Sequence, residues 1–287
     1  MRYCGRLFTD QDLELLQGLL ADRETYPTRA AIARALCETL DWRQSNGRLK
    51  DMSARQALLR MQADGLIVLP LPAHTQGNVP KPLVFTTASD PQEPITGTRR
   101  DLGDLRLELV VRRSDMLLWR ELIARYHYLG YTPLTGARMH YLIYDGSRLL
   151  GAIGFGASAW KLAPREQFIG WTPDQREHNL HLVVNNARFL LLPWVHVKYL
   201  ASSVLALAAR RMQQDWIERH NYRPVLLETF VDHRLYPGTC YKAANWIYVG
   251  DTQGRGKLDR HTLRDKPIKA IFLYPLTKDF RANLTTS

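Results

Sequence analysis

The stretch PVLLETFVD, residues 224–232, decides the fold class of the larger part of the chain. Its nearly continuous apolar run is typical of a strand buried on both faces, as in the sheet of an α/β domain. A long amphipathic helix is predicted before it, over residues 199–216, because apolar residues recur along one face at Leu200, Val204, Leu205, Ala208 and Met212. A short helix over residues 240–245 and a last strand, WIYVGD (246–251), are predicted after it.

Upstream, the pattern alternates between strands and a helix. A strand is predicted over residues 105–112 and a helix over residues 114–126. A hairpin and a further strand are then expected, with the sequences MHYLIYD (139–145), LLGAIGFGA (149–157) and LHLVVNN (180–186). The order β–α–β–β–β–α–β–α–β predicts an α/β (α+β) domain with a mixed sheet over residues 101–287.

The first 70 residues have a different pattern. Helices are predicted over residues 9–20, from Thr28 onward and from near Ser53, and Gly65 ends the third. Residues 66–70, LIVLP, then read as a short strand, so a winged helix-turn-helix domain is expected over residues 1–70. Residues 71–100 are rich in Pro, Gly, Thr and Gln, which is typical of a linker or of an extended arm that lies on the next domain.

The third helix of a winged helix-turn-helix enters the DNA major groove. Candidate DNA contacts on and before this helix are Arg48, Lys50, Arg55, Gln56 and Arg60, since Arg and Gln read base edges and Lys holds phosphate. Residues 1–70 hold ten Lys/Arg and nine Asp/Glu, so most phosphate-binding charge is expected elsewhere. The alternative is a winged helix used only for protein–protein contact.

The charge of the chain indicates a polyanionic partner. The net charge is +11 and the pI about 9.7, which favours nucleic acid first and an anionic membrane surface second. Residues 101–287 carry 26 Lys/Arg against 17 Asp/Glu. No segment approaches the roughly 20 apolar residues of a membrane span, and three scattered cysteines predict a reducing, cytoplasmic location without a structural zinc site.

Two carboxylates in the stretch 224–232 are candidate catalytic residues. Glu228 lies among apolar neighbours, and a carboxylate is costly to bury unless it is paired, binds a metal or transfers a proton. Asp232 lies at the strand end, where α/β sites often form. Together they could hold Mg²⁺ or act as acid and base. The structural alternative is an ion pair between Glu228 and an arginine such as Arg188.

Further polar residues stand next to predicted strands and helices. His127 is a candidate general base or hydrogen-bond donor, and Tyr241 is a candidate nucleophile toward a phosphodiester, beside Arg188. Core packing is the alternative for His127. Phosphate or base contact is expected from Asn185 and Asn186, and from Arg255 and Lys257 in a glycine-rich basic loop whose backbone can approach a phosphate closely. A merely solvated basic segment is the alternative for this loop.

Several long runs together resemble the DruA family of the Druantia antiphage systems, whose members also occur beside transposases. The runs are RYHYLG (125–130), FIGWTPDQREHNLHLVVNNARFLLLPWV (168–195), YLASSVL (199–205), PVLLETFVD (224–232) and GTCYKAANWIYVGDTQGRGK (238–257). The order of elements and the run YKAANWIYVG also resemble the GNAT acyltransferase fold, and this resemblance implies Tyr241 as a general acid. Residues 192–199 contain no glycine to hold a pyrophosphate at a helix N-terminus, so acetyl-CoA is not expected as a cofactor.

Three functions remain open at this point. The first is a DNA-processing enzyme that nicks, cleaves or modifies DNA in antiphage defence or mobile-element biology. The second is a GNAT-like transferase that modifies a nucleobase with a donor other than acetyl-CoA. The third is a non-catalytic DNA-binding adaptor that recruits a helicase, nuclease or transposase.

Overall fold

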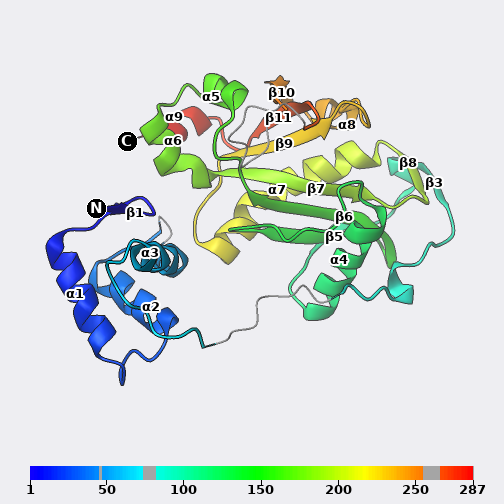
Figure 1. Ribbon diagram of the computed structural model, residues 1–287. Coiled ribbons are helices and arrows are strands. Elements are labelled where there is room, and N and C mark those ends of the chain that lie inside the picture. The colour runs from blue at the N-terminus through cyan, green and yellow to red at the C-terminus, as the bar shows by residue number, and fades with distance from the viewer. Residues whose placement is uncertain (45–46, 74–81, 255–265, 287) are drawn as a thin grey trace. The chain divides into compact units, whose positions relative to one another are not determined.

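The chain forms two compact units, Met1–Pro82 and Leu83–Ser287 (Figure 1). They are seen in a computed structural model that describes residues 1–44, 47–73, 82–254 and 266–286. Each unit encloses a hydrophobic core of its own, and the larger unit has a second apolar cluster at one end of its sheet.

The first unit contains the three predicted helices, α1 (Asp10–Ala21), α2 (Arg29–Thr39) and α3 (Asp51–Ala63). The side chains of Thr9 and Thr28 cap α1 and α2, as expected for hydroxyl residues at an N-cap. A short hairpin precedes the helices, and its strands, β1 (Arg2–Tyr3) and β2 (Arg6–Leu7), have two residues each. The core of the unit is fully buried at Leu16, Ile32, Leu36, Leu58 and Met61.

The strand predicted over residues 66–70 does not form, and that prediction is wrong. The backbone N–H of Leu69 donates to the Gln62 side chain (3.1 Å) rather than to a neighbouring strand, and the carbonyl of Pro70 accepts from Arg29 (2.7 Å). Ile67 and Leu69 are buried in the core of the three helices, so the apolar run reflects packing against helices. A winged helix-turn-helix is therefore not confirmed for this unit.

The second unit is built on one seven-stranded mixed sheet, which confirms the expected α/β class. Its strand order is β10-β11-β9-β7-β6-β5-β4, and every neighbouring pair is antiparallel except β7 and β9, which are parallel. The strands are β4 (Leu105–Leu109), β5 (Met139–Asp145), β6 (Arg148–Ala157), β7 (Val183–Leu191), β9 (Leu226–Asp232), β10 (Ile247–Asp251) and β11 (Lys269–Pro275).

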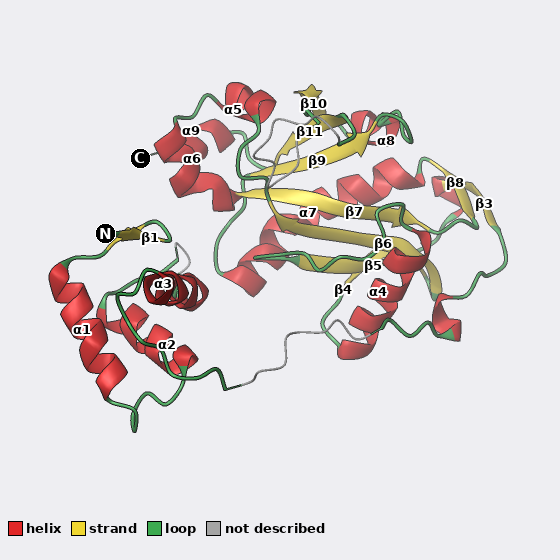
Figure 2. Ribbon diagram, viewed as in Figure 1, coloured by secondary structure: helices red, strands yellow, loops and turns green. Residues whose placement is uncertain are grey.

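Helices cover both faces of this sheet (Figure 2). The His140 ring of β5 lies 4.3 Å from Trp119 of α4 (Arg113–Tyr126), whereas the next residue, Tyr141, donates to Asp215 of α7 (Leu200–His220). Since successive side chains of a strand point to opposite faces, α4 and α7 lie on opposite sides of the sheet. This two-sided cover explains why the central strands are apolar almost throughout.

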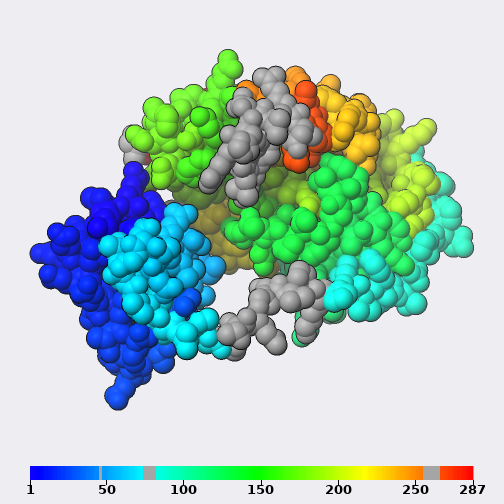
Figure 3. Space-filling model, viewed as in Figure 1, coloured from blue at the N-terminus to red at the C-terminus, as the bar shows by residue number. Residues whose placement is uncertain are grey.

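Several elements were not predicted from the sequence. β11 is inserted between β10 and β9, so WIYVGD is not the last strand as predicted, and residues 180–182 form a 3₁₀ turn rather than the start of β7. β3 (Ile95–Thr98) pairs in parallel with β8 (Val195–Lys198) within the second unit, at the right-hand edge of Figure 3. The remaining helices are α5 (Ala163–Ile169), α6 (Pro173–Asn179), α8 (Thr239–Ala243) and α9 (Phe280–Thr285).

Among the described residues, no helix combines the length and the apolar composition that a membrane span requires.

Candidate functional site

The two parallel strands of the sheet, β7 and β9, separate part-way along their length. Residues 183–186 of β7 pair with residues 226–229 of β9. Beyond this point β7 continues along β6 to Leu191, and β9 continues along β11 to Asp232. Ala187 is an extra residue in β7 relative to β6, because Asn186 is opposite Phe155 and Arg188 is opposite Gly154. Such bulges bend a strand and are frequent beside functional sites.

A pocket of about 490 Å³ lies where these strands diverge. Its walls come from β7, β9, the segment after α4 (residues 126–129), the start of α8 and Lys269 of β11. This volume is in the usual range for small-molecule sites. Six of the residues predicted to be functional line it, namely His127, Asn185, Asn186, Arg188, Asp232 and Tyr241.

Arg188 is the most unusual side chain of the pocket because it is buried and has no acidic partner. It is 9% exposed, and its guanidinium donates only to the Thr132 hydroxyl (2.8 Å) and to the carbonyl of Ala187 (2.7 Å). Within the described part of the chain, its Nε has no hydrogen-bond partner and no carboxylate forms an ion pair with it. Burial lowers the pKa of Arg188, and burial also lowers the pKa of Lys269 nearby.

His127 is a neutral hydrogen-bond donor in this setting. Burial, followed by the positive charges of Arg188 and Lys269, lowers the pKa of His127 to about 4. Its Nδ1 accepts from the backbone N–H of Leu129 (3.2 Å), so the remaining proton lies on Nε2. Of the two roles predicted for His127, this geometry favours the hydrogen-bond donor over the general base.

Tyr241 and Asn186 are bonded to each other. The Tyr241 hydroxyl donates to Asn186 Oδ1 (2.8 Å), and Asn186 Nδ2 donates to the carbonyls of Gly154 and Arg188 (both 3.2 Å). Asn186 therefore holds the bulge of β7 and has no amide hydrogen left for DNA. Burial raises the pKa of Tyr241, so its hydroxyl remains a neutral phenol rather than a nucleophilic phenolate.

Glu228 is separated from the pocket and has a structural environment. It is fully buried, and its two oxygens accept from Arg165 Nη1 (2.7 Å) and from the backbone N–H of Ala159 (2.8 Å). The structural alternative is thus realised with Arg165 rather than with Arg188. Arg165 also forms an ion pair with Glu166 (2.8 Å), and its ion pair with Glu228 connects α5 to β9.

Asp232 lines the pocket but is neutralised by Arg234. The two side chains form a bidentate pair (3.0 and 2.8 Å), which lowers the pKa of Asp232 to about 2. Asp232 and Glu228 are four residues apart along a strand, roughly 13 Å. One Mg²⁺ cannot bridge carboxylates at that separation, and the described residues contain no group of three His, Cys, Asp or Glu that could hold a metal ion.

Tyr128, Tyr236 and Lys269 also line the pocket and were not among the predicted site residues. Tyr128 and Tyr236 are 40% and 51% exposed at the rim, and their ring centroids are 5.7 Å apart. Lys269 begins β11, a strand that was not predicted from the sequence. The two tyrosines in the run YHY (126–128) were a sequence signal for Tyr128, whereas no local sequence pattern indicates Tyr236 as a site residue.

The predicted DNA-contacting residues of the first unit are distributed around α3. Gln56 and Arg60 are exposed on this helix, whereas Arg55 forms an ion pair with Asp51 (3.2 Å). Arg48 and Lys50 come directly before the helix, as predicted. Arg255 and Lys257 lie outside the described residues.

Residues 61–266 match the family described as Druantia protein DruA. The chain belongs to this family. The resemblance inferred from the sequence runs is thereby confirmed for this DruA-family protein. No curated protein matches the chain.

Solved structures align with the second unit at low identity. FeeM, an N-acyl amino acid synthase from uncultured soil microbes, aligns over 63% of this chain and 94% of its own, with 12% identity and a TM-score of 0.38. An aminoglycoside acetyltransferase in complex with coenzyme A aligns over 60% and 95%, with 11% identity and a TM-score of 0.39. Mycobacterium smegmatis RimJ aligns over 64% and 92%, with 12% identity and a TM-score of 0.36. These scores, all below 0.5, establish neither a shared fold nor a shared activity.

Proposed function

We propose that this DruA-family protein acts on DNA in antiphage defence and holds one nucleotide in the pocket between β7 and β9. The observation that carries the proposal is the buried guanidinium of Arg188, which lines the pocket and has no acidic partner among the described residues. An uncompensated buried cation is costly. A phosphate would compensate it through the short, charge-assisted hydrogen bonds that arginine forms with phosphate oxygens.

The remaining pocket residues suit the other parts of a nucleotide. Lys269 adds a second cation, and the His127 Nε2–H supplies a neutral donor to a phosphate or base oxygen. The exposed rings of Tyr128 and Tyr236 at the rim offer faces on which a base can stack. Because a base inside a duplex cannot enter such a pocket, the substrate is an unpaired or everted nucleotide.

We favour modification of this nucleotide over metal-dependent strand cleavage. Both acids that could have held Mg²⁺ are ion-paired with arginines, Glu228 with Arg165 and Asp232 with Arg234. The pocket offers proton donors and cations instead, which suits a transfer reaction. We propose a donor other than acetyl-CoA, since the stretch before α7 has no glycine and the N-cap of α7 is Tyr199.

The binding step can be tested by calorimetric titration with deoxynucleoside monophosphates and with the matching nucleosides. Wild-type protein should bind the monophosphates at least tenfold more tightly than the nucleosides, and Arg188→Met should abolish this difference. Arg112→Met is the matched control, because Arg112 is exposed and its ion pair with Asp115 lies outside the pocket. Equal binding of nucleotide and nucleoside by the wild type would contradict the proposal.

The chemical step can be tested on labelled single- and double-stranded DNA incubated with cell extract as the source of a donor. Nucleosides from digested DNA would be examined by mass spectrometry, and strand lengths on a denaturing gel. A mass-shifted nucleoside that is absent with Arg188→Met supports modification. Shorter strands would indicate cleavage, and unchanged DNA that remains bound would favour the adaptor function.

A further inference from the structure

A second depression of the larger unit, about 470 Å³ in volume, is lined by arginines and lies outside the pocket between β7 and β9. Arg99 and Arg100 come from the 3₁₀ turn η2 (Arg99–Asp101), and Arg210 comes from α7. The apolar floor is formed by Leu105, Ala206 and Leu207. We call this depression the arginine groove.

The fold brings these cations together from distant parts of the sequence. β3 pairs with β8 so that Thr98 lies opposite Lys198, which places the start of η2 beside the segment that leads into α7. Ser203, Leu207 and Arg210 are spaced i, i+4 and i+7, so they share one face of α7. Lys198 is exposed and adds a fourth positive charge close to the groove.

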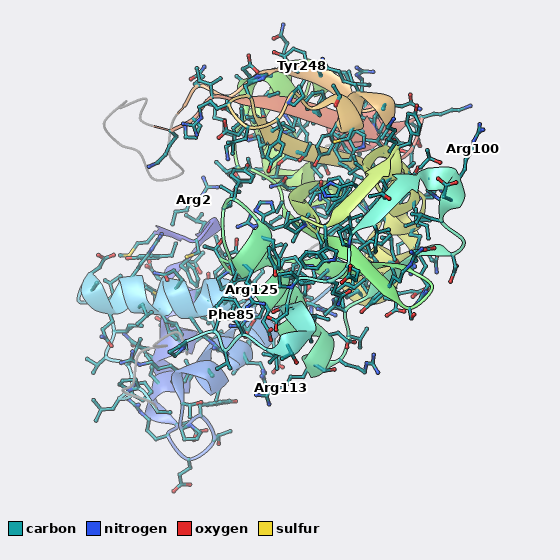
Figure 4. All side chains as sticks on the ribbon, turned by 90° about the vertical axis from the view of Figure 1, so that its right-hand side faces the viewer. Arg2, Phe85, Arg100, Arg113, Arg125 and Tyr248 are labelled. Atoms are coloured by element: carbon teal, nitrogen blue, oxygen red, sulfur yellow. The ribbon has the colours of Figure 1, made fainter. Side chains whose placement is uncertain are left out.

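The positive charges of the groove are not neutralised by acids. No Asp or Glu lines it, and within the described ranges Arg99, Arg100 and Arg210 form no ion pair. Arg99 donates to the carbonyl of Leu102 (3.1 Å), while Arg100 projects outward from its ribbon (Figure 4). The neighbouring Arg106 differs, because Asp104 and Glu108 both pair with it.

We propose that the arginine groove binds the backbone phosphates of the DNA on which the protein acts. The inference rests on the proposed function for the identity of the polyanion. Guanidinium groups bind phosphate bidentately, and several along one groove release counterions from a polyanion. Contacts of the groove arginines with backbone phosphates carry no sequence information directly, so this binding is independent of sequence. The groove positions the DNA, whereas the pocket takes one nucleotide.

The test compares two triple variants that lose the same formal charge. Arg99, Arg100 and Arg210 are replaced together by Gln in the groove variant. Arg106, Arg112 and Arg148, each already ion-paired, are replaced by Gln in the control variant. Binding to a 20-base-pair duplex of arbitrary sequence is followed by fluorescence anisotropy of the full chain between 50 and 300 mM salt.

The groove variant should bind the duplex about tenfold more weakly at 100 mM salt, and its slope of log affinity against log salt should be smaller by about 2 to 3. The control variant should remain within about twofold of the wild type. Equal losses in both variants would show that only net charge matters, and would overturn the proposal. An unchanged slope in the groove variant, or no duplex binding by the wild type, would also overturn it.

The groove proposal and the pocket proposal can fail independently of each other. The groove variant should bind mononucleotides like the wild type, whereas Arg188→Met should keep the duplex salt slope and lose mononucleotide binding. If the groove variant behaves like the wild type while Arg188→Met loses nucleotides, only the groove proposal fails. If Arg188→Met binds nucleotides normally while the groove variant is weak, only the pocket proposal fails.

Discussion

Two arginines of the larger unit, Arg165 and Arg188, are both buried, but their surroundings differ. Arg165 is fully buried and is bonded to Glu228 and Glu166, so its charge is compensated within the protein. Arg188 is nearly as buried, yet its guanidinium meets only a hydroxyl and a carbonyl and faces the pocket. The difference separates a charge that holds the fold from one that is available to a ligand.

The largest effect is expected at the Arg165 side of this comparison. Arg165→Met leaves Glu228 as an unpaired buried carboxylate, which should lower the free energy of unfolding of the second unit by about 3 to 5 kcal/mol. Urea unfolding followed by tryptophan fluorescence measures this, because six of the seven tryptophans lie in that unit.

The double variant Arg165→Met with Glu228→Leu is the internal control for that prediction. Removing both charges should recover most of the lost stability, since apolar replacement of a whole buried ion pair is often close to neutral. If Arg165→Met were as stable as the wild type, Arg165 would not stabilise the fold, and the contrast with Arg188 would be wrong.

At the Arg188 side, stability and binding should separate. Arg188→Met removes a buried charge that has no acidic partner, so the free energy of unfolding should stay within about 1 kcal/mol of the wild type or rise. Nucleotide affinity should fall at least tenfold, equivalent to about 1.4 kcal/mol. Urea unfolding and calorimetry on the same preparation check both parts. A loss of stability as large as that of Arg165→Met would make Arg188 a structural residue.

How far the sequence anticipates this contrast can be followed along β9. The apolar run of residues 224–232 predicts the strand and indicates that burying the Glu228 carboxylate is costly. The ion-pair partner of Glu228 is Arg165 in α5, a helix that was not predicted from the sequence. Similarly, Asn185, Asn186 and Arg188 were predicted as site residues, whereas the divergence of β7 from β9 depends on pairing between distant segments. Local sequence patterns predict the strand, whereas pairing between distant segments decides which polar residues lie together.

Two errors have the same origin. Residues 66–70 form a short apolar run like a strand, but they pair with no strand of the described residues and pack against helices instead. Residues 269–275 were not predicted as a strand, yet they form β11 between two other strands and bring Lys269 to the pocket. In both cases the neighbours available in space overrode the local pattern.

A smaller effect is expected at Tyr241, which lines the pocket but is bonded within the protein. Tyr241→Phe leaves Asn186 Oδ1 without its donor and should cost about 1 to 2 kcal/mol of unfolding free energy. Nucleotide affinity should change by less than about threefold. Tyr248→Phe, at a ring that is 48% exposed, is the control. A large loss of affinity in Tyr241→Phe would assign its hydroxyl to the ligand.

The smallest effect concerns pH. Because the pKa of His127 is lowered to about 4, this side chain stays neutral between pH 5 and 8 and adds positive charge only as the pH falls toward 4. Affinity for a dinucleotide phosphodiester, whose own charge is constant, should vary by less than about twofold over pH 5 to 8 and rise below that range. Calorimetric titrations of wild type and His127→Gln measure it. A tenfold rise centred near pH 6.5 in the wild type alone would mean that His127 titrates normally.

The most direct measurement is a crystal structure of the protein with a deoxynucleoside monophosphate at a concentration well above its dissociation constant. The account predicts that the phosphate lies within hydrogen-bond distance of the Arg188 guanidinium, with the base against Tyr128 and Tyr236. A nucleotide bound elsewhere, with the pocket between β7 and β9 unchanged, would contradict it.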